Sequence, residues 1–237
     1  MIGIIGAMNE EISVILNELK DIEEIYKYNI KFYKGFYKNK EIVVVESGVG
    51  MVNASTIATL LISIFDIELL LFSGVAGGLK EGIKVGDVVI GTSFVEYMYD
   101  LSKIDNKYVK GQIAGTKKRD ISACDKLLNF VKKLNLENIY YGRIISGDTF
   151  VADMKIKEEL IKEFNPFAVD MESAAVAHTC VKLGIDYLII RSISDAYKGT
   201  YVEYEKFLNY ACNNSKNIIF NILERLIKWE IKVFWLV

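Results

Sequence analysis

Short apolar runs alternate with helical patterns along most of the chain, and this alternation strongly limits its possible folds. Brief runs bounded by turn residues are typical of buried strands, whereas apolar residues three and four apart are typical of helices. Strands that alternate with helices predict a mixed or largely parallel sheet flanked by helices. The expected strands are 2–5, 30–37, 41–46, 68–73, 87–94, 139–146, a short one around 168, and 187–193; the expected helices are 9–19, 54–65, 122–134, 156–164, 173–182 and 204–228.

Domain organisation follows from what separates these elements. The chain has a single proline, Pro166, and no Ser-, Pro- or Gly-rich linker or internal repeat, so residues 1–237 are expected to form one domain. Residues 97–116 are polar and unpatterned, and a loop of that length in a compact domain is often functional. The last residues, 229–237, form an apolar tail, which we expect to pack on the core or on a second subunit.

Composition excludes several classes of function. The net charge is −2, with 29 basic and 31 acidic residues and no basic block, so nucleic-acid binding is not expected. No apolar run approaches the roughly 18 residues of a membrane span, and no signal peptide is evident. Three scattered cysteines fit reduced thiols in the cytoplasm. A lone histidine makes a His-based metal site or a Ser-His-Asp triad improbable, so no metal or cofactor is expected.

Two acidic segments carry the clearest chemical signal. One contains Val169-Asp170-Met171-Glu172, at the junction of an expected strand and helix. In the other, the apolar run 187–193 ends in Ser194 and Asp195. The carboxyl ends of strands in open α/β sheets are where ligands bind, and burial there can keep a carboxyl group protonated. A protonated acid beside an ionised one is the pair that glycosidic bond cleavage requires.

Glycine-rich turns follow several of the expected strands, at 3–8, 47–50 and 73–78. Glycines there would let a ligand approach the main chain closely. None of these turns fits GxGxxG opening a βαβ unit, or GxxxxGK[ST], so a nucleotide-phosphate site is disfavoured. Glu11 comes soon after the first strand, in the first turn of a helix. The turns and carboxylates together predict a lined pocket at one edge of the sheet.

In these segments the chain resembles the 5′-methylthioadenosine/S-adenosylhomocysteine nucleosidases of the nucleoside phosphorylase superfamily. The motifs that carry the resemblance are Gly3-Ile-Ile-Gly-Ala-Met-Asn-Glu-Glu11, Glu46-Ser-Gly-Val-Gly50, Ser73-Gly-Val-Ala-Gly-Gly78 with Val85-Gly-Asp87, Ser146-Gly-Asp-Thr-Phe150, Val169-Asp-Met-Glu172 and Arg191-Ser-Ile-Ser-Asp195. They follow the family's order over most of the chain. The resemblance implies a three-layer α/β/α sandwich with a central mixed sheet, and a homodimer that binds a small nucleoside without a cofactor.

The resemblance also implies roles for individual residues. Asp195 matches the acid that protonates adenine N7, Glu11 the residue that activates water, and Glu172 the carboxylate that holds the ribose hydroxyls. Arg191 would lie next to the acid and the water, where its charge would help to keep Glu11 ionised. The substrate-binding residues implied are Met8, Val49, Gly77, Phe150, Val151, Met171, Ser194 and Tyr204.

Hydrolysis is favoured over phosphorolysis by the scarcity of cations. A phosphorylase must hold a phosphate dianion, usually with several cationic groups. The chain has four arginines, none of them in its first 118 residues, and Glu11 would place negative charge near the phosphate space.

The loop 97–116 departs from the family pattern. In the family this loop covers the 5′ substituent in the partner subunit's pocket. Ile104 stands near the position of an expected aromatic residue, so either Ile104 or Tyr108 would line that pocket. This departure leaves the preferred 5′ substituent open.

Three functions are therefore compatible with the sequence. The leading one is a hydrolase that releases adenine from 5′-methylthioadenosine and S-adenosylhomocysteine. The second is a related enzyme, either a purine nucleoside phosphorylase or a futalosine-type nucleoside hydrolase. The third is a nucleoside-binding protein without turnover, against which the presence of Glu11, Glu172 and Asp195 argues.

Overall fold

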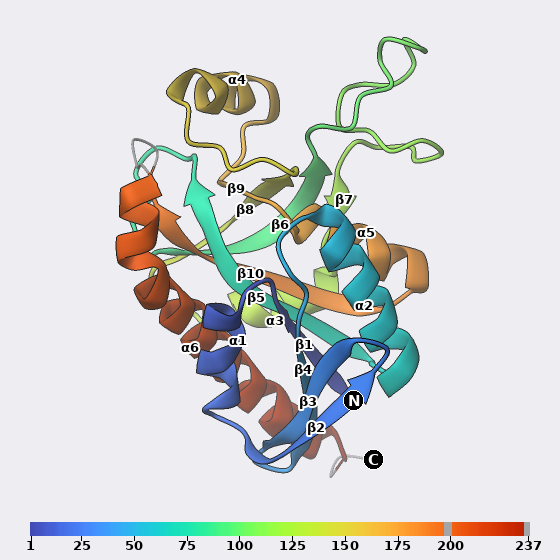
Figure 1. The fold of residues 1–237 in the computed structure, drawn as a ribbon, viewed down its shortest axis with the longest axis vertical. Coiled ribbons are helices and arrows are strands. Elements are labelled where there is room, and N and C mark those ends of the chain that lie inside the picture. Colours follow the sequence, from blue (N-terminus) through green and yellow to red (C-terminus); the bar gives the residue numbers. More distant parts are fainter. Residues whose placement is uncertain (197–200, 235–237) are drawn as a thin grey trace.

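A mixed ten-stranded sheet forms the centre of the molecule, with helices on both of its faces (Figure 1). The computed structural model describes residues 1–196 and 201–234, with side chains up to residue 227. The strands are β1 Ile2–Gly6, β2 Lys20–Lys27, β3 Ile30–Tyr37, β4 Lys40–Glu46, β5 Leu69–Gly78, β6 Val88–Glu96, β7 Ile121–Ser122, β8 Ile139–Ser146, β9 Ala168–Asp170 and β10 Asp186–Asp195. The helices are α1 Asn9–Leu16, α2 Met51–Phe65, α3 Asp125–Lys132, α4 Met154–Phe164, α5 Ser173–Leu183 and α6 Tyr201–Phe234.

The direction of four strands creates the edge at which a site can form. β1 pairs in parallel with β4 and β5, and β5 pairs in parallel with β10. These strands therefore end on the same side, at Gly6, Glu46, Gly78 and Asp195. The sheet also closes on itself, because β10 continues through β6, β8 and β9 back to β5. This closure brings β9 and the start of α5 to the end of β5.

Helices on the two faces bury the apolar side chains of the sheet. α6 and α1 pack together on one face, and α2 and α5 pack together on the other (Figure 1). In α2 the buried side chains recur three and four residues apart, which is the spacing of one helix face; they are Ala54, Ile57, Ala58, Leu61 and Phe65. The apolar tail expected at 229–237 lies outside the residues whose side chains are described.

The element pattern predicted from the sequence is largely confirmed, with three corrections. The strand β2 was not predicted, because it is an edge strand whose residues are mostly exposed and therefore lack the apolar alternation of a buried strand. The segment 73–78 is not a turn: it continues β5, pairing with β10 and β9. The expected helix 122–134 begins only at Asp125, because Ser122 pairs with Ser93 of β6.

Candidate active site

A cavity at the carboxyl ends of the parallel strands collects most of the predicted site residues. Its lining includes the three predicted acids and, among the predicted substrate contacts, Met8, Val49, Gly77, Phe150, Met171, Ser194 and Tyr204. Two predicted residues do not line it. Arg191 is fully buried behind the acids, and Val151 is buried in a core cluster with Tyr97 and Leu160. The tertiary structure thus brings together residues from both ends of the chain.

Glu11 is held by main-chain donors from two elements. It occupies the third position of α1, and one of its oxygens accepts hydrogen bonds from the backbone N–H groups of Ala7 and Met8. The other oxygen accepts from the backbone N–H of Val75 in β5 at 2.9 Å. These bonds fix the carboxyl group, which is only 2% exposed, at the wall of the cavity.

A buried arginine links the acids on one side of the cavity. Arg191 Nε lies 2.7 Å from Asp170 Oδ2, and its Nη2 lies 3.5 Å from Glu172 Oε2. The guanidinium carbon lies 3.9 Å from the centre of the Phe72 ring, a cation–π contact that covers its apolar face. Neither Nη atom has a hydrogen-bond acceptor within the described part of the chain. The geometry makes Arg191 the counter-charge of this acidic cluster.

Glu172 differs from its expected local role. The sequence predicts that the amino end of the following helix favours the Glu172 anion. Glu172 is the N-cap residue of α5, but its side chain makes no cap hydrogen bond and instead accepts from the backbone N–H of Gly50 at 3.0 Å. Asp170 accepts from the N–H groups of Glu172 and Ser173 at this helix start. The Asp-x-x-Ser spacing is the signal in the sequence that could have identified Asp170 as the structural acid.

Asp195 stands apart from this arginine-centred cluster. Its Oδ1 accepts a hydrogen bond from Ser194 Oγ at 3.0 Å, and its Oδ2 lies 3.5 Å from Nζ of Lys157. Lys157 comes from α4, its side chain is fully buried, and it was not among the residues singled out from the sequence. Arg191 was expected beside the acid, but the ion pair of Asp195 in the described structure is with Lys157.

Burial raises the pKa of each of the three acids. It raises the pKa of Glu11, and the nearby positive charge of Arg191 opposes but does not cancel this effect. It raises the pKa of Glu172 to about 7, again against Arg191. It also raises the pKa of Asp195, against Lys157. Arg191 therefore favours the Glu11 anion as expected, although burial is the larger influence.

Aromatic rings form part of the cavity and of its surroundings. The Phe150 and Tyr204 rings, which both line the cavity, meet edge to face with their centres 5.5 Å apart. Tyr201 stacks on Tyr204 at 5.9 Å. The cavity has a volume of about 80 Å³ and is partly open to the surface. A flat base can pack against such rings, because aromatic rings attract one another in offset or edge-on geometry.

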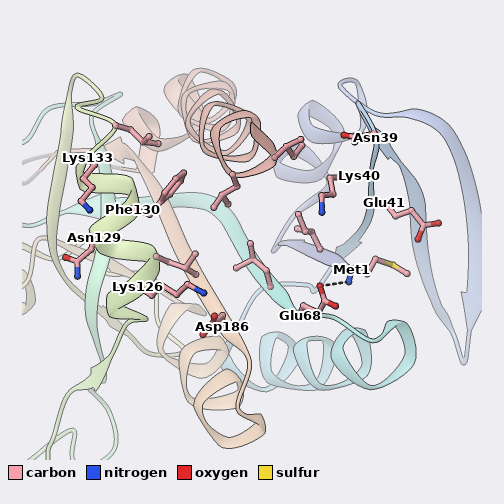
Figure 2. Close-up of a pocket in the computed structure, with 16 residues that line it drawn as sticks. Met1, Asn39, Lys40, Glu41, Glu68, Lys126, Asn129, Phe130, Lys133 and Asp186 are labelled. Atoms are coloured by element: carbon pink, nitrogen blue, oxygen red, sulfur yellow. Dashed lines mark ion pairs between the residues drawn. The ribbon is translucent and has the colours of Figure 1, made fainter. Parts of the chain in front are cut away.

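A larger cavity, of about 950 Å³, lies elsewhere (Figure 2). It is bordered by Met1, Leu69 and Asp186, at the amino ends of the strands whose carboxyl ends form the candidate site, and by Lys126 and Lys133 around α3. Figure 2 shows the amino group of Met1 paired with Glu68, at 3.4 Å. None of the predicted site residues borders this cavity. The smaller cavity is nevertheless the candidate active site, because the clustered acids line it.

Comparison with known proteins identifies the family. Residues 1–227 match a family model described as the phosphorylase superfamily. The chain belongs to this superfamily. A curated relative from Exiguobacterium sp., named 5′-methylthioadenosine/S-adenosylhomocysteine nucleosidase, is 34% identical over 230 residues, or 95% of this chain and 98% of the relative. The family resemblance seen in the sequence is therefore confirmed.

Solved structures agree with this membership of the phosphorylase superfamily. A futalosine hydrolase of Helicobacter pylori has a TM-score of 0.89 and 35% identity, covering 94% of this chain and 97% of that one. An Asp-to-Asn mutant of the H. pylori methylthioadenosine nucleosidase, solved with 5′-methylthioadenosine in its active site, has a TM-score of 0.88 and 36% identity, covering 94% and 98%. The nucleoside phosphorylase-like α/β fold predicted from the sequence is confirmed.

Two features of the described residues bear on other classes of function. No group of three or more His, Cys, Asp or Glu side chains in that part of the chain is placed to hold a metal ion. None of the helices described there has both the length and the apolar character needed to cross a bilayer.

Proposed function

We propose that the protein hydrolyses the N-glycosidic bond of 5′-methylthioadenosine and S-adenosylhomocysteine, and also of 5′-deoxyadenosine, releasing adenine. The observation that carries this proposal is the meeting of Glu11, Glu172 and Asp195 on one small cavity beside aromatic rings. Relatives that are at least a third identical over almost the whole chain bear this enzyme's name. Residues 1–237 would act as one catalytic domain, serving methionine salvage.

Asp195 is the proposed proton donor. Burial raises its pKa, so the carboxyl group can carry a proton where an exposed aspartate would not. The proton passes to N7 of adenine while the bond between C1′ and N9 breaks, so the base leaves neutral. General acid catalysis of this kind contributes roughly 10²- to 10⁴-fold.

Glu11 is the proposed base for the attacking water. Its carboxylate is fixed by three backbone N–H groups, so it can orient a water molecule without reorganising. The positive charge of Arg191, buried behind the cavity wall, favours the Glu11 carboxylate that this role requires.

The remaining residues would hold the nucleoside. Glu172 would accept hydrogen bonds from the ribose hydroxyls and stabilise the positive charge that develops on the sugar. Met171 would pack on the ribose, and Phe150 and Tyr204 on the base. The main chain of Val151 would bind the adenine edge, a role that needs no side chain in the cavity.

Phosphorolysis is disfavoured by the charge of the cavity. Its lining includes Glu11, Asp170, Glu172 and Asp195 but no lysine or arginine among the described residues. A phosphate dianion would meet this negative charge without a direct cationic contact.

A futalosine-type nucleoside hydrolase remains the second candidate, because a structure with that name matches this chain as well as the methylthioadenosine nucleosidases do. Both reactions release a base by hydrolysis, and the group at the 5′ position distinguishes them. The deciding experiment assays the purified protein on methylthioadenosine, S-adenosylhomocysteine, 5′-deoxyadenosine, aminodeoxyfutalosine and inosine, each with and without phosphate. We expect adenine release from the first three without phosphate. Strict phosphate dependence would indicate a phosphorylase, and binding without release a non-catalytic protein.

We also propose a homodimer in which the loop 97–116 of one subunit lies near the pocket of the other. Around this loop the chain projects from the rest of the molecule (Figure 1), and Met98, Ile104 and Val109 are exposed. Ile104, 83% exposed, is a stronger candidate than the half-buried Tyr108 for a contact made only in the dimer. Sedimentation equilibrium of the wild type and of Ile104→Asp tests this: a wild-type monomer would contradict the proposal.

The proposed location is the cytoplasm. The thiols of Cys124, Cys180 and Cys212 are free in the structure, as a reducing compartment requires. Fractionation of cells that express the full chain would test the location.

A further inference from the structure

Lys157 is a fully buried lysine whose chemistry the proposed reaction leaves unused. It is the fourth residue of α4, and its side chain has no exposed surface. Burial of an ammonium group is costly unless a partner compensates for the lost hydration. The Nζ atom lies 3.5 Å from Asp195 Oδ2, which is 38 residues away in the sequence and itself almost fully buried. The buried positive charge of Lys157 thus lies next to the proposed acid.

The charged groups near the cavity divide into two separate centres. Arg191 faces Asp170 and Glu172 and acts electrostatically on Glu11. Asp195 faces the ammonium of Lys157 from α4 and the hydroxyl of Ser194 from its own strand. From β5, Gly77 presents only backbone close to the Asp195 carboxyl group. Among the described residues, Lys157 is therefore the cation paired with Asp195.

We propose that Lys157 is the positioning residue of the general acid: it fixes the Asp195 carboxyl group and stabilises the carboxylate left when the proton has gone. This inference rests on the proposed role of Asp195. In the step, the Asp195 proton passes to N7 of the base, and the electrons of the bond between C1′ and N9 pass to N9. Water adds its oxygen to C1′ and gives a proton to Glu11. Solvent then returns a proton to Asp195 and takes one from Glu11, and Lys157 neither gains nor loses one.

Two opposing influences explain why a cation belongs at this position. Burial raises the pKa of Asp195, so its carboxyl group holds the proton to a higher pH than an exposed aspartate does. Burial alone would also make the acid weak, because its anion would be left in an apolar surrounding. The Lys157 ammonium stabilises this anion and so limits the rise in the pKa of Asp195. Asp195 can then hold its proton before the reaction and release it to the base during the reaction.

The test combines a pH profile with a double-mutant cycle. The variants are Lys157→Met, Asp195→Asn and the pair together, with Lys155→Met as the control from an exposed position of the same helix. In Lys157→Met we expect kcat to fall about 10-fold or more, within the range of general acid catalysis. KM should change little, because Lys157 does not line the cavity. Lys155→Met should keep wild-type activity.

The pH profile separates this role from a purely structural one. Loss of the Lys157 charge should move the alkaline limb of kcat to higher pH by about one unit or more, because Asp195 then holds its proton more tightly. In Asp195→Asn that limb should vanish, and adding Lys157→Met to this variant should not lower kcat further. An unmoved limb in Lys157→Met, or losses that multiply in the double variant, would overturn the proposal.

Two further outcomes keep the inference distinct from the proposed function. If the wild type releases no adenine, or if Asp195→Asn keeps its activity, the proposed function fails and the Lys157 role fails with it. If both behave as proposed but Lys157→Met matches the wild type, only the Lys157 role fails. Should Lys157→Met not fold, Lys157→Gln provides the same pH test, because it can donate a hydrogen bond to Asp195 without the charge.

Discussion

Arg191 and Asp170 form an ion pair of 2.7 Å in the interior of the protein, where neither side chain has more than 2% of its surface exposed. The pair joins β10 to the junction between β9 and α5, 21 residues earlier in the chain. Removing one partner of such a pair leaves an uncompensated buried charge, which is more costly than the pair itself is stabilising.

Asp170→Asn should therefore destabilise the fold. We expect the free energy of unfolding to fall by about 3 kcal/mol, since the longer contact with Glu172 is then the ion pair that Arg191 keeps, beside its hydrogen bond to Ser173 Oγ. Urea denaturation followed by circular dichroism measures this. Asp21→Asn, an exposed position, is the matched control and should stay within about 0.5 kcal/mol of the wild type. A similar small change in Asp170→Asn would show that the pair contributes little.

Asp195→Asn should remove turnover while leaving the substrate bound. An amide cannot donate the proton that a carboxylic acid gives to N7, so we expect kcat to fall by about 10²- to 10⁴-fold. Calorimetry should show that methylthioadenosine still binds. Asp186→Asn, at the exposed opposite end of the same strand, should retain full activity. Loss of folding in Asp195→Asn would instead indicate a structural role.

Activity should fall on the acid side of neutrality. Glu172 is proposed to act as an anion, and burial raises its pKa to about 7. A carboxyl group with a raised pKa loses its charge as the pH falls through that value, so kcat/KM should decrease below about pH 7. Adenine release measured between about pH 5 and 9, with the fold monitored by fluorescence, tests this. A rate that stays constant down to about pH 5, near the ordinary range of a glutamate, would contradict it.

Gly74→Ala should displace the buried side chains of Arg191 and Glu11. A Cβ atom at this position would overlap Arg191 Nη1 and lie 2.6 Å from Glu11 Oε1. Displacing these buried groups should cost about 1–3 kcal/mol of stability and most of the activity. Thermal unfolding and adenine release measure the two effects.

Gly82→Ala provides the contrast for this variant. Nothing lies within 4 Å of its new Cβ, although its φ of +86° is unfavourable for alanine. It should lose about 1 kcal/mol of stability through backbone strain and keep its activity. Equal activity losses at both glycines would argue against a specific clash at Gly74.

Much of the site could be predicted because its residues stand next to strong local signals. Asp195 ends an apolar run, Glu172 stands where a strand gives way to a helix, and Glu11 lies in the first turn of a helix. Such positions follow from periodicity, which depends on near neighbours in the chain. Their assembly on one cavity follows because parallel strands present their carboxyl ends at the same edge.

The partners of these acids depended on contacts between distant elements. The sequence around Lys157 is an ordinary charged helix, and nothing in it indicates that one of its lysines lies fully buried against Asp195. Asp170 was given no role of its own in the acidic segment, yet it is the closest partner of Arg191. The glycines at 74, 77 and 78 were expected in a turn but lie in β5, where their lack of a side chain leaves room for Arg191, Glu11 and Asp195.

The sequence by itself determined the alternation of strands and helices and the family, and it singled out the three acids that line the cavity. Only the tertiary structure decided which cation faces which acid. Residue type and spacing specify local conformation, whereas a pairing across 38 residues, as between Lys157 and Asp195, depends on how α4 packs against the end of β10. Burial, which raises the pKa of each of these acids, likewise depends on the packing of the whole fold.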